Sequence, residues 1–304
     1  MSKVFYLVSL PLIFCSCKNE LPLNDDMSVK LFVEVGNSPF SRTVTSVDGS
    51  VDFLENDITG MFIENIDNPV AWTYRNGNWV TENSMKWENR TDDFEFLAYY
   101  PCVQTDNVLR SSVPMPDLSV QSGNISDIGE KDFLVGKCVT SYADNNGIVS
   151  FSGENSFVHV YSLLHLSVIN DDQSQSFSMK ECSFFGEGIV TPHVYSFDTS
   201  SEGMKKSGSD DISVLQINDL SSLSAVTVLI NPVTLQTPLR FTLRYISGDK
   251  EYEASANLGN NFAGGSFSKI TLRIIDGKLV MTGNEVTDWN VITLDEVILN
   301  GASV

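Results

Sequence analysis

Histidine side chains are the groups in this sequence best suited to bind a transition metal or to transfer protons. There are three of them, His159, His165 and His193. His159 and His165 lie six residues apart, so on one strand they would face the same side but stand about 20 Å from each other. One ion cannot span that distance. The spacing therefore favours half-buried, hydrogen-bonded histidines, and we predict no metal site.

Carboxylates are abundant, but their arrangement does not favour a cation site. The segment Asp144-Asn145-Asn146-Gly147 comes nearest to a calcium loop, yet it lacks the regularly spaced oxygen ligands of one and predicts a turn instead. The chain has 39 Asp and Glu residues against 19 Lys and Arg, a formal net charge of -20. Such an acidic surface repels nucleic acid and anionic lipid head groups, which excludes nucleic acid as a partner.

Catalytic motifs are missing from the sequence. It has no G-x-S-x-G, H-E-x-x-H, G-x-G-x-x-G or phosphate-binding lysine motif. Two carboxylates that meet only in the folded chain could hydrolyse a glycoside, and this alternative stays open. We predict a protein that is not an enzyme and needs no cofactor.

Cysteines and tryptophans are the remaining groups with recognisable chemistry. Cys102, Cys138 and Cys182 do not have the spacing of a metal site. A Cys102–Cys138 disulfide and three buried free thiols both fit the sequence, so the disulfide state stays open.

Trp72, Trp79 and Trp87 lie within sixteen residues of one another. Clustered aromatic rings can face a ligand, above all a glycan, and these three are candidate ligand-facing aromatics. Aromatic residues on a twisted hairpin also stabilise it through cross-strand pairs, which is the commoner arrangement.

The N-terminus has the pattern of an exported lipoprotein. Lys3 precedes a short apolar run from Val4 to Phe14, which is about half the length of a membrane-spanning helix. The run ends at a small residue followed by Cys17, which resembles a bacterial lipobox. We therefore predict a lipoprotein signal peptide over residues 1–16, a lipid such as palmitate on Cys17, and a spacer over residues 17–28. An ordinary signal peptide is the alternative.

Beyond the spacer the pattern is that of strands. Alternating or short apolar runs predict eight of them: Val29–Val35, Ile58–Ile63, Phe94–Tyr100, Val158–Ile169, Ser176–Phe185, Ala225–Ile230, Leu239–Tyr245 and Phe267–Ile275. Asn76-Gly77 and Asp276-Gly277 predict two tight hairpin turns. No long segment sustains a helical stripe. The sequence predicts an all-β protein with two tandem β-sandwich domains, over residues 29–150 and 151–304.

Several local motifs, taken in order, resemble the fimbrillin family, the pilin-like lipoproteins that build type V pili in Bacteroidales. They are Phe40-Ser41-Arg42-Thr43, Asp57-Ile58-Thr59-Gly60-Met61-Phe62-Ile63, Gly77-Asn78-Trp79, Phe94-Glu95-Phe96-Leu97-Ala98-Tyr99-Tyr100-Pro101, Phe157-Val158-His159, Gly264-Gly265-Ser266-Phe267 and Val286-Thr287-Asp288-Trp289. The resemblance implies transthyretin-like β-sandwich domains and a surface location on the outer membrane and in a fimbrium.

The resemblance also implies how such a subunit assembles. A protease would cut after Arg42, leaving Thr43 as the new N-terminus, and the first strand would be lost. A donor strand from another pilin subunit would fill the groove by β-augmentation. In the C-terminal tail the candidate donor side chains are Ile292, Leu294, Val297 and Leu299, although Asp295-Glu296 shifts their alternation to the other face.

These observations predict a structural, adhesive subunit of a surface fimbria. The alternative is a surface lipoprotein that does not polymerise and binds a glycan or a host protein. Under that alternative the first strand stays in place and the tail completes its own domain.

Overall fold

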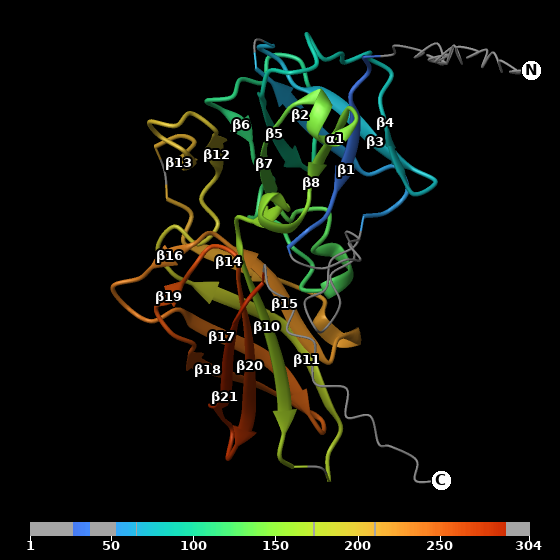
Figure 1. The fold of residues 1–304 in the computed structure, drawn as a ribbon. Coiled ribbons are helices and arrows are strands. Elements are labelled where there is room, and N and C mark those ends of the chain that lie inside the picture. The colour runs from blue at the N-terminus through green and yellow to red at the C-terminus, as the bar shows by residue number, and fades with distance from the viewer. Residues whose placement is uncertain (1–26, 37–52, 65, 173, 210, 290–304) are drawn as a thin grey trace, which may run out of the picture.

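The computed structural model describes residues 27–36, 53–64, 66–172, 174–209 and 211–289. Strands dominate these ranges, which confirms the all-β prediction. In Figure 1 the strands from β1 to β8 occupy the upper half, and the two four-stranded sheets occupy the lower half. Within the described residues, no helix is long and apolar enough to cross a membrane.

The upper half is built on a six-stranded antiparallel sheet (Figure 1). In spatial order its strands are β4 (Asn78–Val80), β3 (Val70–Arg75), β2 (Ile58–Ile63), β5 (Phe94–Tyr100), β7 (Leu134–Thr140) and β9 (Val158–His159). A separate pair, β1 (Lys30–Val33) and β8 (Ile148–Phe151), runs in parallel. Gly136 of β7 lies so close to Phe157 that a Cβ atom on it would approach the ring to 2.4 Å. The aromatic core therefore packs directly on the sheet backbone.

The lower half contains two four-stranded sheets. One has the order β15 (Ala225–Ile230), β10 (Ser162–Asn170), β20 (Ser266–Ile275) and β21 (Lys278–Asp288). The other has the order β14 (Val214–Ile217), β11 (Phe177–Phe185), β17 (Arg240–Ser247) and β18 (Lys250–Asn257). Alternate residues of both sheets belong to one cluster of buried apolar side chains, which is the arrangement of a sandwich.

Short elements complete the structure. The small sheets join β13 (Gly203–Lys206), β12 (His193–Ser196) and β6 (Val113–Pro114), and pair β16 (Val233–Thr234) with β19 (Asn261–Phe262). The helical turns are η1 (Ile125–Asp127), α1 (Tyr142–Asn145), η2 (Gly153–Asn155) and η3 (Leu220–Ser222). Because β6 precedes β7 and pairs with β12, segments from both halves of the sequence meet at this side of the molecule (Figure 1).

The segment expected as one strand over residues 158–169 is two strands. β9 joins the six-stranded sheet, whereas β10 joins a four-stranded sheet, with the break at Val160 and Tyr161. The Val160 amide donates to the Phe133 carbonyl at 3.0 Å, and the buried Tyr161 hydroxyl donates to the Pro116 carbonyl at 2.9 Å. The division expected between residues 150 and 151 falls inside β8, so we propose the break after β9 as the domain boundary.

Candidate functional site

The first strand is held by backbone hydrogen bonds to segments far along the chain. The amides of Lys30 and Glu34 donate to the carbonyls of Gly147 and Phe151 at 3.0 and 2.8 Å. On the opposite edge, the Val29 amide donates to the Met85 carbonyl at 2.9 Å. The strand expected at Val29–Val35 is therefore present, inserted between two other segments at its start and paired in parallel with β8 for the rest.

The side chains of this strand alternate between core and solvent. Val29, Leu31, Val33 and Val35 are buried, whereas Phe32 is 47% exposed. This alternation puts all four aliphatic side chains on the core-facing side. We call the space that these four side chains fill, between β8 and the Met85–Trp87 segment, the first-strand groove.

The floor of the first-strand groove is apolar. Leu31 lies opposite Val149, Val33 opposite Phe151 and Val35 opposite Phe157, and these three partners are fully buried. The Phe151 and Phe157 rings pack edge to face with their centroids 5.3 Å apart. The side chains of these three partners form no hydrogen bonds with water, so the groove suits an apolar, alternating strand.

The three tryptophans do not form an exposed ligand patch, and that interpretation is wrong. Trp72, Trp79 and Trp87 are only 3%, 8% and 3% exposed. Trp79 pairs across the β3–β4 hairpin with Tyr74, at a centroid distance of 5.2 Å, as cross-strand aromatic pairing predicts. The Trp87 amide donates to the Met27 carbonyl at 2.8 Å, so this tryptophan also borders the first-strand groove.

The histidines lie in three different environments and share no site. His159 is buried, with Nδ1 2.7 Å from Asp132 Oδ2. His165 on β10 contacts the Thr227 hydroxyl at 2.8 Å, and burial lowers its pKa. His193 contacts the Thr191 carbonyl at 2.7 Å. Among the described residues no group of His, Cys, Asp and Glu side chains could hold a metal ion.

The three cysteines are free and buried, so the Cys102–Cys138 disulfide considered above is absent. Burial raises the pKa of all three thiols, because it disfavours the thiolate. The segment considered for calcium is also occupied. Ser141 caps α1 by accepting a hydrogen bond from the Asp144 amide at 3.2 Å, and the Ser141 hydroxyl donates to the Asp144 carboxylate at 2.7 Å.

The end of β21 is fixed to the rest of the protein by Trp289. Its indole ring stacks on the His159 imidazole, with centroids 3.7 Å apart and planes at 6°. Its amide donates to the Gly265 carbonyl at 2.6 Å. The candidate donor residues begin just after this anchored tryptophan. Ile292, Leu294, Val297 and Leu299 lie outside the described residues, as do Cys17, Arg42 and Thr43.

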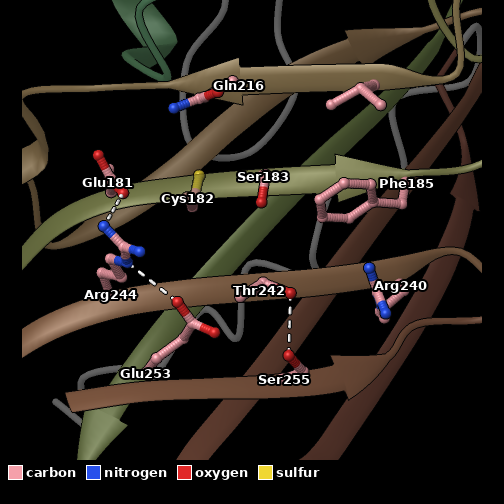
Figure 2. Close-up of a pocket in the computed structure, with 11 residues that line it drawn as sticks. Glu181, Cys182, Ser183, Phe185, Gln216, Arg240, Thr242, Arg244, Glu253 and Ser255 are labelled. Atoms are coloured by element: carbon pink, nitrogen blue, oxygen red, sulfur yellow. Dashed lines mark hydrogen bonds and ion pairs between the residues drawn. The ribbon is translucent and has the colours of Figure 1, made fainter.

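A second surface, not anticipated from the sequence, lies on the outer face of the sheet β14-β11-β17-β18 (Figure 2). It is a hollow of about 310 Å³ lined mainly by polar and charged side chains, with the apolar Phe185 and Val214 side by side at one end. The strands Ser176–Phe185 and Leu239–Tyr245 were expected, and Arg240, Thr242 and Arg244 alternate along the second of them. That alternation is the feature of the sequence that indicates a polar outer face. The pairing of β11 with β17, which forms the face, is not visible in the sequence.

The family model described as fimbrillin-like matches residues 44–289, which is most of the chain. The chain belongs to the fimbrillin-like family. Fimbrillins are fimbrial, adhesion-related proteins of the cell surface, and their role is structural and not enzymatic. No curated protein matches the chain.

Two crystal structures show the same fold as this fimbrillin. A candidate cell adhesion protein from Bacteroides ovatus is 14% identical, with a TM-score of 0.61 over 88% of this chain and 99% of that one. A candidate cell adhesion protein from Bacteroides uniformis is also 14% identical, with a TM-score of 0.62 over 86% and 98% of the two chains. At this identity the likeness concerns the fold alone.

Proposed function

We propose that this fimbrillin is a fimbrial subunit that assembles by strand exchange at the first-strand groove. In this proposal the chain is exported as an outer-membrane lipoprotein through Cys17. A protease then cuts after Arg42, and a strand from a neighbouring subunit replaces β1. The observation that carries the proposal is the place of β1 in the chain, because β1 is the one described strand that precedes Arg42.

Cleavage at that point would detach β1 without interrupting any other described strand. The backbone attachment of β1 and its flanking residues is the ladder to β8 and Phe157 and the short contact with Met85 and Trp87. These are backbone hydrogen bonds, which any strand of suitable length can reproduce. This attachment supports the proposal that a replacement strand can take the place of β1.

Energetics favour replacement over an empty groove. Each of the four aliphatic side chains in and beside β1, which are Val29, Leu31, Val33 and Val35, contributes about 1.5–3 kcal/mol when fully buried. Together they contribute about 6–12 kcal/mol, which is comparable with the 5–15 kcal/mol stability of a whole domain. Loss of β1 would also leave the amide and carbonyl groups of β8 unpaired. An emptied groove is thus strongly driven to bind a new apolar strand.

The C-terminal tail is the proposed donor. Its candidate side chains are Ile292, Leu294, Val297 and Leu299, and it starts directly after the anchored Trp289. A donor with two residues between its second and third apolar side chains needs a bulge to keep all four facing the groove. Host proteins and glycans are not required for this assembly step.

The test is the N-terminal sequence and mass of the protein from intact cells, for the natural chain and an Arg42→Ala variant. We expect the natural chain to begin at Thr43 and to form polymers. The Arg42→Ala chain should begin at lipidated Cys17 and stay monomeric, because β1 still fills its groove. Arg75→Ala, which removes an exposed arginine of β3, is the matched control and should behave like the natural chain.

A natural chain that begins at lipidated Cys17 and forms no polymer would overturn the proposal. That result would instead support the alternative, a surface lipoprotein that retains its first strand. Polymer formation by Arg42→Ala at the natural level would show that processing at this arginine is unnecessary.

A further inference from the structure

The outer face of the sheet β14-β11-β17-β18 has an arrangement of side chains that strand exchange does not explain. This face is turned away from the core of the sandwich, and its hollow of about 310 Å³ is open to solvent (Figure 2). Its side chains form three rows that cross the strands, because residues in register on neighbouring strands stand beside each other. Each row has a different chemistry.

The two outer rows differ in charge. In one, Phe185 of β11 lies beside Arg240 of β17. In the other, Arg244 of β17 lies between Glu181 and Glu253, at 3.0 and 2.9 Å from their carboxylate oxygens (Figure 2). The two rows are four residues apart along β17, which is about 13 Å. One end of the hollow therefore carries an unneutralised cation, and the other carries two carboxylates around one cation.

The guanidinium of Arg240 is positioned to bind an anion. Its guanidinium lies over the Phe185 ring, with Cζ 4.5 Å from the centroid. Within the described residues it forms no ion pair, in contrast to Arg244. A guanidinium stacked by one face keeps its in-plane N–H groups available, and their fork matches a carboxylate in a bidentate manner.

The middle row consists of neutral, hydrogen-bonding side chains: Gln216, Ser183, Thr242 and Ser255. The Thr242 and Ser255 hydroxyls share a hydrogen bond of 2.9 Å, and either can donate. Ser183 has no hydrogen-bond partner for its hydroxyl in the described part of the chain. We call this row the trough, because Ser183, Thr242 and Ser255 are shorter than the side chains beside them in the two outer rows.

The trough matches the hydroxyl groups of a sugar. Hydroxyl and amide side chains can each donate and accept, as sugar hydroxyls do, and several of them converge here. A peptide that adds to the sheet would pair with the edge strands β14 or β18, at the two ends of the trough, and not with the hydroxyl side chains in its middle. Nucleic acid is disfavoured by the two glutamates and by the overall charge.

We propose that the trough binds the terminal residue of a glycan that ends in a single carboxylated sugar. The carboxylate pairs with Arg240, and the ring of the terminal sugar lies over Ser183 and Thr242. The next, neutral sugar reaches Glu181 and Glu253, which accept hydrogen bonds from its hydroxyls. A second acidic sugar is excluded, because its carboxylate would meet these two glutamates.

The test uses the full chain and isothermal titration calorimetry with three trisaccharide or disaccharide probes. They are sialyllactose, a lactose chain ending in glucuronic acid, and lactose itself. We expect at least one acidic probe to bind, and lactose to bind at least about tenfold more weakly, because a charge-assisted bidentate pair is lost. Which acidic probe binds more tightly identifies the kind of acid.

Two variants locate the binding. Arg240→Gln should weaken the acidic probe at least about tenfold and leave lactose unchanged. Arg273→Gln is the matched control, since it removes another surface arginine, paired with Asp171 on the neighbouring sheet, and should not change the affinity. Ser183→Trp should abolish binding by filling the trough.

The proposal is overturned if neither acidic probe binds at millimolar concentration, or if lactose binds as tightly as they do. Full affinity in Arg240→Gln or Ser183→Trp would overturn it as well. None of these results depends on cleavage at Arg42, so the glycan site and strand exchange can fail separately.

Discussion

The first-strand groove and the trough are both made by the alternation of side chains along strands, but they have opposite physical character. In the groove, Val29, Leu31, Val33 and Val35, in and beside β1, point into an aromatic core. In the trough, Ser183 and Thr242 point to solvent from strands whose other face is buried. A groove of the first kind is stable only when a strand fills it, whereas the trough is stable without a ligand.

This difference separates assembly from recognition. An apolar groove is suited to a partner that, once bound, stays, because its release would expose apolar surface to water. A polar trough exchanges hydrogen bonds with water for hydrogen bonds with a ligand, so its net gain is small and its ligand can leave. One chain can thus hold a permanent contact at one end and a reversible contact at the other.

The largest expected effect is that of a charge placed in the first-strand groove. Val33→Asp should lower the free energy of unfolding of the uncleaved chain by about 3–5 kcal/mol, because it buries an unpaired carboxylate against Phe151. Urea unfolding followed by tryptophan fluorescence measures this. Phe32→Asp, at the exposed neighbouring position, is the control. Equal effects of the two substitutions would contradict the inward orientation of Val33.

A smaller effect is expected from overpacking the core beneath the groove. In Gly136→Ala the new methyl group would stand 2.4 Å from Phe157 and 2.9 Å from Phe151. We expect a loss of about 1–3 kcal/mol as these rings shift, together with weaker binding of a donor strand. Gly283→Ala, whose methyl group would meet Thr271 at an ordinary 3.5 Å, should change stability by less than about 0.5 kcal/mol. The comparison fails if Gly136→Ala is equally well tolerated.

The smallest effect is expected when the same acidic residue is placed in the trough. Thr242→Asp should cost about 1 kcal/mol or less, because the new carboxylate stays solvated and only the hydrogen bond to Ser255 is lost. The same urea titration measures it beside Val33→Asp. A loss as large as that of Val33→Asp would show that the outer face is not solvent-facing.

Local rules explain the parts of the fold that the sequence predicts. Strands β2, β5 and β15 have the residues that their apolar patterns predict. Both residues of each predicted hairpin turn have positive φ, namely 51° and 78° at Asn76-Gly77 and 49° and 72° at Asp276-Gly277. These features depend on side-chain alternation and on backbone sterics within a few residues, so the residues of each strand or turn determine it.

Other strands were missed because their sequences carry no pattern of their own. β21 is an edge strand with exposed residues on both faces, and it forms by pairing with β20. The break between β9 and β10 is also invisible locally, since the apolar run continues through it. Phe133 and Pro116 fix that break by hydrogen bonds from distant positions.

The sequence by itself determined the strand-forming character of the chain, its turns, its acidity and its alternating first strand. Tertiary structure alone decided that this strand lies parallel to β8, that three tryptophans are buried, that the cysteines stay apart, and that Arg240 stands over Phe185 beside a polar trough. The physical reason is the separation along the sequence over which each interaction acts. Alternation and turn sterics act between neighbours in sequence, whereas strand pairing and burial depend on which distant segments meet.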